Sequence, residues 1–396
     1  ENEGTAVFPD HDLIVVDGGS VGLRPGQVAV SRDRATNTYS ATLRVSGRQF
    51  ALVEPGAQDE LIAQWGIALQ AFINERTPVS SVRWSEWAAP AGLDDHRRWL
   101  RDQRSRDALP EVEEHYVALL REAGSQVTRH ETLVTVSVDA NEIRLRRRDG
   151  TTRMHAAIRL LLGELRLFTQ RLEGAQLVVH GPLSPQEWAR AMRLRLDPSC
   201  RTALDARSRA LGDEAGSCRP ENAAPMAAVQ RWTSWQSDDA WHRAFYVSEW
   251  PRLDVSAGWL APLIGFDGAV RSFTVFFEPV APSDSRRSIR RQASKISSDS
   301  EHRSKHGFRV GADYRRAAND VEEREAELVA GYGEVSYAGI VTVTAQSEDE
   351  LDDAAELMIM TASRVGIELR PLSGRHDQAV CATLPLARAL VPRTML

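Results

Sequence analysis

One pattern limits the fold of this chain more than any other: a strand, a helix and a second strand follow one another, and this succession occurs twice. In residues 39–45, apolar and polar side chains alternate, as they do in a half-buried strand. Leu61, Trp65 and Leu69 then recur at helical spacing, and residues 79–87 alternate again. Strand, helix and strand in this order are half of a ferredoxin-like, or split βαβ, unit.

The rest of the first half continues with elements of the same kind. A helix after Pro110 carries Val112, Tyr116 and Leu119 on one face. A strand over residues 132–138 precedes a helix with a long apolar stripe between residues 158 and 172. A short strand is predicted over residues 175–180.

The second half repeats this theme. Residues 270–280 are apolar on both faces, which is typical of a central strand that is covered on both sides. Residues 282–330 are charged and weakly amphipathic, as in long helices with much exposed surface. The remaining predicted elements are a strand at 242–249, a short helix at 255–260 and strands at 335–345, 367–371 and 378–384, the last of which contains Cys381.

Two capping boxes mark helix starts. Ser184 and Glu187 enclose a proline at the first helical position, so the serine hydroxyl and the glutamate carboxylate can satisfy exposed amides reciprocally. Ser347 and Glu350 have the same spacing.

We therefore expect an α+β protein composed of two ferredoxin-like halves with long inserted helices. The length of 396 residues allows two or three domains. Residues 198–230 lose periodicity and collect Pro, Gly, Ser and Ala, which favours a boundary there. The predicted divisions are a flexible N-terminal segment (1–24), a first α+β domain (25–197), a linker or long loop (198–230) and a second α+β domain (231–396) with a helical insertion (282–330).

Composition and motifs argue against several classes of function. The net charge is −6, so the total charge does not suggest a surface coated with nucleic acid. A P-loop needs a lysine directly after a glycine, and neither Lys295 nor Lys305 has that position. Cysteines and histidines are too scattered for a disulfide framework or a zinc site. We therefore expect no catalytic, cofactor-binding or metal-ligating residues, and no enzyme.

Hydropathy predicts no membrane-spanning segment. No apolar run approaches the ~18 residues that a membrane helix needs. The sequence begins at Glu1 and not with methionine, so we expect a processed or truncated piece. If the intact protein contacts a membrane, the anchor lies outside this sequence.

A basic segment between residues 286 and 305 is the first candidate for partner binding. Spacings of three and four place several of its cations on one helical face, which could meet phosphates, acidic lipid headgroups or an acidic protein. The absence of interleaved aromatic residues argues against stacking on single strands. A solvated helix face is the alternative. The residues are Arg286, Arg287, Arg290, Arg291, Lys295, Arg303 and Lys305.

Trp259 and Leu260 are the second candidate. They begin an apolar stretch that runs to Ile264. Such a stretch either packs into the core or forms a docking patch for another protein. The sequence leaves both interpretations open.

Several short motifs resemble a known family: Tyr-Val-Ser-Glu-Trp-Pro at 246–251, residues 258–264, the strand from Arg271, residues 337–344 and Cys-Ala-Thr-Leu-Pro at 381–385. Residues 23–87 fit more loosely. The pattern resembles an actinobacterial family of membrane-tethered proteins encoded beside small PrgI-like proteins and conjugation-type ATPases. That family is similar to the non-ATPase amino-terminal domain of type IV secretion ATPases, the CagE/TrbE/VirB group. The chain departs from the pattern around residues 374–378 and lacks the family's paired transmembrane helices.

The resemblance implies a non-enzymatic scaffold or docking component of a membrane-associated, type IV-like secretion or conjugation apparatus. Such a protein would recruit a separate ATPase, or assemble with copies of itself, at the cytoplasmic face of the plasma membrane. One alternative is a nucleic-acid-binding adaptor that acts through residues 286–305, although nucleic acid is the less favoured partner. Others are a component of the type VII secretion membrane complex and an enzyme of unrecognised type.

Overall fold

The computed structural model describes residues 5–8, 10–19, 23, 26–47, 53–70, 79–90, 100, 110–124, 128–143, 152–212, 218–305, 312–330 and 333–387. Among these residues, a mixed α+β fold is built on one 13-stranded sheet with antiparallel pairings. The strands are β1 (Thr5–Phe8), β2 (His11–Asp17), β3 (Gln27–Asp33), β4 (Thr38–Ser46), β5 (Val79–Pro90), β6 (Thr128–Asp139), β7 (Val178–Pro182), β8 (Ala228–Gln230), β9 (Trp235–Ser237), β10 (Ala240–Glu249), β11 (Val270–Val280), β12 (Glu334–Ala345) and β13 (Glu368–Pro371).

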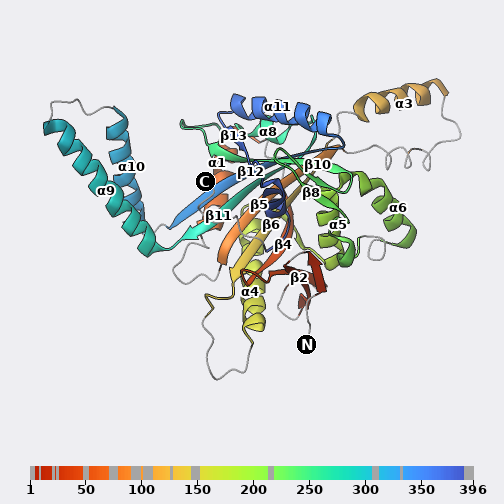
Figure 1. Ribbon diagram of the computed structural model, residues 1–396, viewed down its shortest axis with the longest axis horizontal. Helices are drawn as coiled ribbons and strands as arrows, with labels where there is room; N and C mark the ends of the chain where they lie inside the picture. Colours follow the sequence, from red (N-terminus) through yellow and green to blue (C-terminus); the bar gives the residue numbers. More distant parts are fainter. Residues whose placement is uncertain are drawn as a thin grey trace.

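Helices connect these strands along the chain (Figure 1). They are α1 (Pro55–Gln70), α3 (Pro110–Gly124), α4 (Arg153–Gly174), α5 (Pro185–Leu196), α6 (Arg201–Leu211), α8 (Ala261–Ile264), α9 (Pro282–Lys305), α10 (Ala312–Val329), α11 (Glu348–Arg364) and α12 (His376–Thr383).

The same order of strands occurs in each half of the sheet. In the first half the neighbours are β7-β4-β6-β5, and in the second they are β13-β10-β12-β11. Along the chain, a helix follows the first and the third strand of each set. In the first half α1 follows β4 and α4 follows β6, and in the second half α8 follows β10 and α11 follows β12. Further helices are inserted at the same connection in both halves: α3 lies between β5 and β6, and the α9–α10 hairpin lies between β11 and β12.

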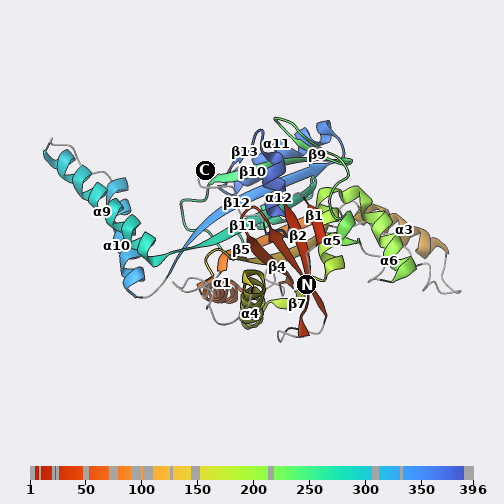
Figure 2. The ribbon, with the colours of Figure 1, turned by 60° about the horizontal axis from the view of Figure 1, so that its bottom comes forward.

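Strand β5 pairs with β11 and thereby joins the two halves. Figure 2 shows the red and orange strands of the first half continuing into the cyan and blue strands of the second. The division of the chain into two domains stays a prediction, because a continuous sheet is compatible with one large domain or two tightly joined ones.

Both faces of the sheet are covered. On one face, α1 and α4 pack over the first half and α8 and α11 over the second, and Trp84 and Phe277 contact the apolar clusters beneath both sets. On the other face, Trp188 of α5 and Cys381 of α12 belong to a third cluster, which reaches Leu133 of β6. Each half therefore contributes to the core on both sides of the sheet.

Local sequence explains where helices α5 and α11 begin. The hydroxyl of Ser184 accepts from the amide of Glu187 at 3.2 Å, and the amide of Ser184 donates to the Glu187 carboxylate at 2.9 Å. The predicted capping box before α5 is therefore confirmed. At α11 the hydroxyl of Ser347 accepts from the amide of Glu350, while the Glu350 carboxylate accepts from the amide of Gln346 and not from that of Ser347.

Four sequence predictions of local structure were wrong. The N-terminal segment 1–24 contains β1 and β2, because apolar residues such as Leu13 and Ile14 find partners in the sheet. Segment 198–230 contains helix α6, and no helix covers 255–260. Residues 378–384 form most of helix α12 and not a strand, because that segment packs across the sheet face.

The chain after α12 crosses onto the first half. Trp188 of α5 donates its indole N–H to the carbonyl of Pro385 at 2.6 Å. The amide of Ala387 donates to the hydroxyl of Ser31 in β3 at 3.2 Å. The last described residues therefore fasten the second half to the first from outside the sheet.

Charged side chains are buried at the β5–β11 junction. Arg271 of β11 is 1% exposed and pairs with Glu86 of β5, whose carboxylate is also 2.5 Å from Nδ1 of His130. On the opposite face, the hydroxyls of Ser85 and Thr274 lie 2.9 Å apart across the same junction. The two halves are thus joined by polar side chains as well as by backbone bonds.

Removing one member of the buried pair should strongly destabilise the protein. Arg271→Met leaves the Glu86 carboxylate buried without its principal cation, and we expect a loss of about 3–5 kcal/mol in the free energy of unfolding. Urea denaturation followed by circular dichroism measures this loss. Glu249→Gln, which removes an exposed ion pair with Arg252, is the control and should change stability little. Equal effects of the two substitutions would contradict the prediction.

Candidate functional site

The predicted basic face lies on α9. Arg286, Arg287, Arg290, Arg291 and Lys295 are all exposed. The four arginines line an open pocket of about 630 Å³ together with two serines of the same helix. The side chains of Arg303 and Lys305, near the end of α9, lie outside the described residues. Among the described side chains, the cations therefore form a continuous surface that a partner can reach.

Helix α10 packs against α9 and carries the opposite charge. Ile289 of α9 and Val321 of α10 are buried, and Arg324 of α10 donates to the amide oxygen of Gln292 at 2.9 Å. Sequence analysis did not single out the acidic side chains of α10, although they stand together in the sequence. The exposed ones are Asp320, Glu322, Glu323, Glu325 and Glu327.

Trp259 and Leu260 lie elsewhere. Both are half-buried in the segment before α8 and pack against the apolar cluster under α11. The pocket lined by the α9 arginines does not include them. The structure therefore does not gather the two predicted groups into one site.

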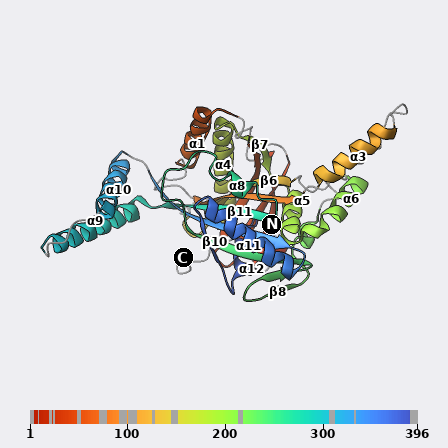
Figure 3. The ribbon, with the colours of Figure 1, turned by 90° about the horizontal axis from the view of Figure 1, so that it is seen from above.

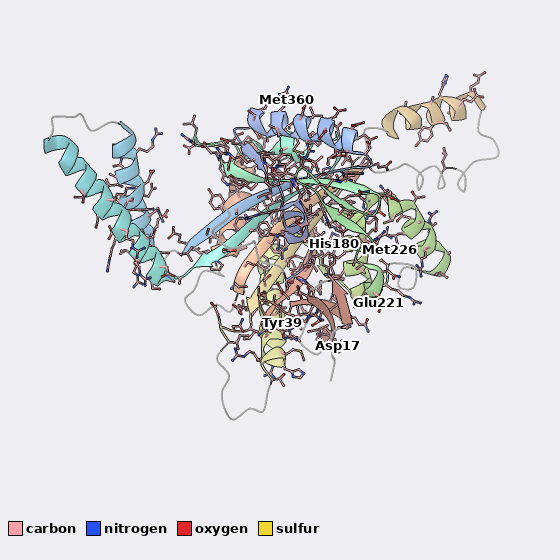
Figure 4. All side chains as sticks on the ribbon, in the orientation of Figure 1. Asp17, Tyr39, His180, Glu221, Met226 and Met360 are labelled. Atoms are coloured by element: carbon pink, nitrogen blue, oxygen red, sulfur yellow. The ribbon has the colours of Figure 1, made fainter. Side chains whose placement is uncertain are left out.

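An apolar face of α3 is exposed. Val112 is 62% exposed, Tyr116 40% and Leu119 63%, although their spacing predicts a buried stripe. Figure 3 shows α3 and the α9–α10 hairpin projecting from opposite ends of the sheet. On α11, Met360, labelled in Figure 4, is 51% exposed on the outer side of the helix. Sequence periodicity identifies such stripes but cannot tell whether the chain itself covers them.

A groove of about 1340 Å³ lies between strands β4, β6 and β7 and helices α5 and α6. Arg44 in its wall pairs with Glu131 at 3.1 Å and with Glu187 at 2.6 Å. Burial opposes ionisation of Glu131, but Arg195 and Arg44 outweigh it, so the pKa of Glu131 is lowered. The groove is larger than the roughly 300–1,000 Å³ of most small-molecule pockets. Its residues come from distant parts of the sequence, which is why sequence analysis missed it.

A Ser–His pair of the kind that hydrolases use is present but sealed. The hydroxyl of Ser237 lies 2.8 Å from Nε2 of His242, and Nδ1 of His242 lies 2.9 Å from the hydroxyl of Thr344. Both Ser237 and His242 are 0% exposed, and a threonine stands where a catalytic triad has a carboxylate. Burial lowers the pKa of His242 to about 4, which keeps the ring neutral at physiological pH. We conclude that these three residues hold β9, β10 and β12 together.

His242 should make stability depend on pH. Its folded pKa lies below that of an unfolded histidine, so its contribution is complete above about pH 6.5 and is lost as the pH falls towards 4. Between pH 7.5 and pH 5 we expect this residue to cost about 2 kcal/mol of unfolding free energy. Urea titrations at the two pH values measure the cost.

The substitution His242→Gln supplies the control, because glutamine keeps a hydrogen-bonding side chain but does not titrate. Between the two pH values, the unfolding free energy of this variant should fall by about 2 kcal/mol less than that of the native chain. Equal losses in the two proteins would assign the acid sensitivity to other groups, such as His376, whose pKa burial also lowers.

Within the described part of the chain, no group of three or more His, Cys, Asp or Glu side chains has the arrangement of a metal site. None of the described helices combines the length and the apolar character needed to cross a membrane. In comparisons with protein families and with curated proteins, no match to this chain is found.

Proposed function

We propose that this protein is a non-enzymatic scaffold of a membrane-associated, type IV-like secretion or conjugation apparatus, at the cytoplasmic face of the plasma membrane. It recruits a separate ATPase or assembles with copies of itself. The observation that carries the proposal is the exposed apolar stripe of α3, a helix that projects from the sheet. Amphipathic helices gain most of their stability by packing their apolar side, so α3 is suited to bind a partner.

We also propose that each half of the chain is a ferredoxin-like unit. The orders β7-β4-β6-β5 and β13-β10-β12-β11 support this, since both sets are antiparallel and contain two crossover helices. The resemblance to the non-ATPase domain of secretion ATPases extends over segments of both halves. A duplicated unit presents its inserted helices at two equivalent places, which suits a protein that brings partners together.

The α3 stripe can be tested directly. Val112→Glu combined with Leu119→Glu places charge on the apolar face, and we expect at least a tenfold loss in capture of the ATPase, because an unpaired buried charge opposes docking. The measurement is a pull-down with the conjugation-type ATPase that the resemblance predicts to be encoded nearby.

The matched control is Glu111→Gln combined with Glu114→Gln, which changes exposed acidic residues of the same helix. This control should capture the ATPase as well as the native chain does. Capture that is absent in the native chain, or equal in all three proteins, would refute recruitment through α3.

A nucleic-acid-binding adaptor is the second candidate. The exposed arginines of α9 favour it, because phosphate backbones attract such a surface. The acidic side chains of α10, directly beside α9, weaken it, since they repel phosphates. We therefore rank a protein partner for α9 above a nucleic acid.

A further inference from the structure

The α9–α10 hairpin has two distinguishable sides. The bond between Gln292 and Arg324 crosses from α9 to α10 on one side. At 3.6 residues per turn, Arg286 and Arg290 of α9 point to the other side, and so do Glu322 and Glu325 of α10. This second side therefore carries a basic strip next to an acidic strip. Below we call it the charged side.

Within the described residues, no ion pair joins the basic strip of the charged side to the acidic strip beside it. Asp284 lies 3.3 Å from Arg287, but Arg287 points away from the hairpin and this exposed pair involves neither Arg286 nor Arg290. Val329 of α10 is 84% exposed, so the hairpin also leaves apolar surface in solvent. A partner that fits must offer an acidic strip beside a basic one, at the spacing of two packed helices.

We propose that the partner of the charged side is the same side of a second copy of this chain, and that the two hairpins form an antiparallel four-helix bundle. A two-fold axis along the bundle places α9 of each copy against α10 of the other, so both contacts join a basic to an acidic strip. The alternative two-fold arrangement places α9 on α9 and α10 on α10, and like charges oppose it.

This inference deepens the proposed scaffold function and rests on it, because it names how copies assemble. It also explains the composition of the insertion. A hairpin that bound only phosphates would bind them more tightly with fewer acidic residues. Self-complementary pairing, in contrast, requires charges of both signs on one side. The acidic residues of α10 are then half of the recognition surface.

A charge-swap experiment tests the pairing. The basic-strip variant is Arg286→Glu with Arg290→Glu, and the acidic-strip variant is Glu322→Arg with Glu325→Arg. Each variant alone opposes like charges at both contacts, so its dimer dissociation constant should rise at least tenfold. An equimolar mixture restores opposite charges at both contacts, and its affinity should return to within about threefold of the native dimer.

Sedimentation equilibrium at low ionic strength gives the dissociation constants, and circular dichroism shows that each variant is folded. The control is Glu323→Arg with Glu327→Arg, which changes the same charge on α10 away from the charged side and should leave dimerisation as it is. The native dimer should also weaken as salt rises, because exposed charges are screened.

Three results would overturn the inference: a native chain that stays monomeric at low salt, a mixture that fails to recover affinity, or a control that weakens the dimer as much as the acidic-strip variant. If the native chain is a monomer that binds duplex DNA or anionic vesicles, and Arg286→Glu with Arg290→Glu abolishes this binding, the basic strip serves those ligands and the inference is also overturned. The scaffold proposal is judged separately: a monomer that still captures the ATPase through α3 keeps that function, and a dimer that captures none loses recruitment while self-assembly stands.

Discussion

Strand β5 buries an ionisable side chain on each face of the sheet, and the packing of both faces depends on the partners of these two side chains. Arg83 is fully buried and donates to the carbonyl of Leu384 at 2.8 Å and to those of Ala382 and Leu386. Burial lowers the pKa of Arg83 to about 10, which leaves it charged at neutral pH. Its charge lies at the end of α12, where the helix dipole is negative. On the opposite face, Glu86 finds Arg271.

The face beneath α5 and α12 is lined by small hydroxyl side chains as well as by apolar ones. Thr42 and Thr135 lie 2.9 Å apart, and Ser272 and Thr342 lie 2.6 Å apart, each pair joining neighbouring strands. In each pair one hydroxyl donates to the other, which lowers the cost of burying these polar groups. Small side chains also let α12 and the segment after it approach the sheet closely. The carbonyls of that segment can then reach Arg83.

The sequence allowed most of the sheet to be predicted, because β4, β5, β10, β11 and β12 carry regular patterns of apolar residues. Prediction from sequence failed where contacts with distant parts of the chain determine the local structure. Val380 and Ala382 alternate with other residues as in a strand, yet the segment is helical because it lies across the sheet with Arg83 at its end. Strands β1–β3 were missed because their neighbouring residues are rich in glycine and aspartate.

The candidate sites show the same division between local and non-local information. Spacing alone predicted that Arg286 and Arg290 share an exposed face, because charge and helical period are local properties. The exposure of Val112 and Leu119 was not predictable, since it depends on which surfaces the rest of the chain covers. Arg44 and Glu187 meet across the groove although 143 positions separate them, and no local pattern records such a meeting.

The outer strands of the sheet have a consequence for how partners are chosen. Strand β8 has three residues and β1 has four, so each margin presents few backbone amides and carbonyls to solvent. A strand of another protein would form few backbone hydrogen bonds there, and such bonds depend little on the amino-acid sequence. Discrimination between partners then falls to side chains on the protruding helices, where a single wrong sign or a misplaced methyl group is enough to reject a competitor.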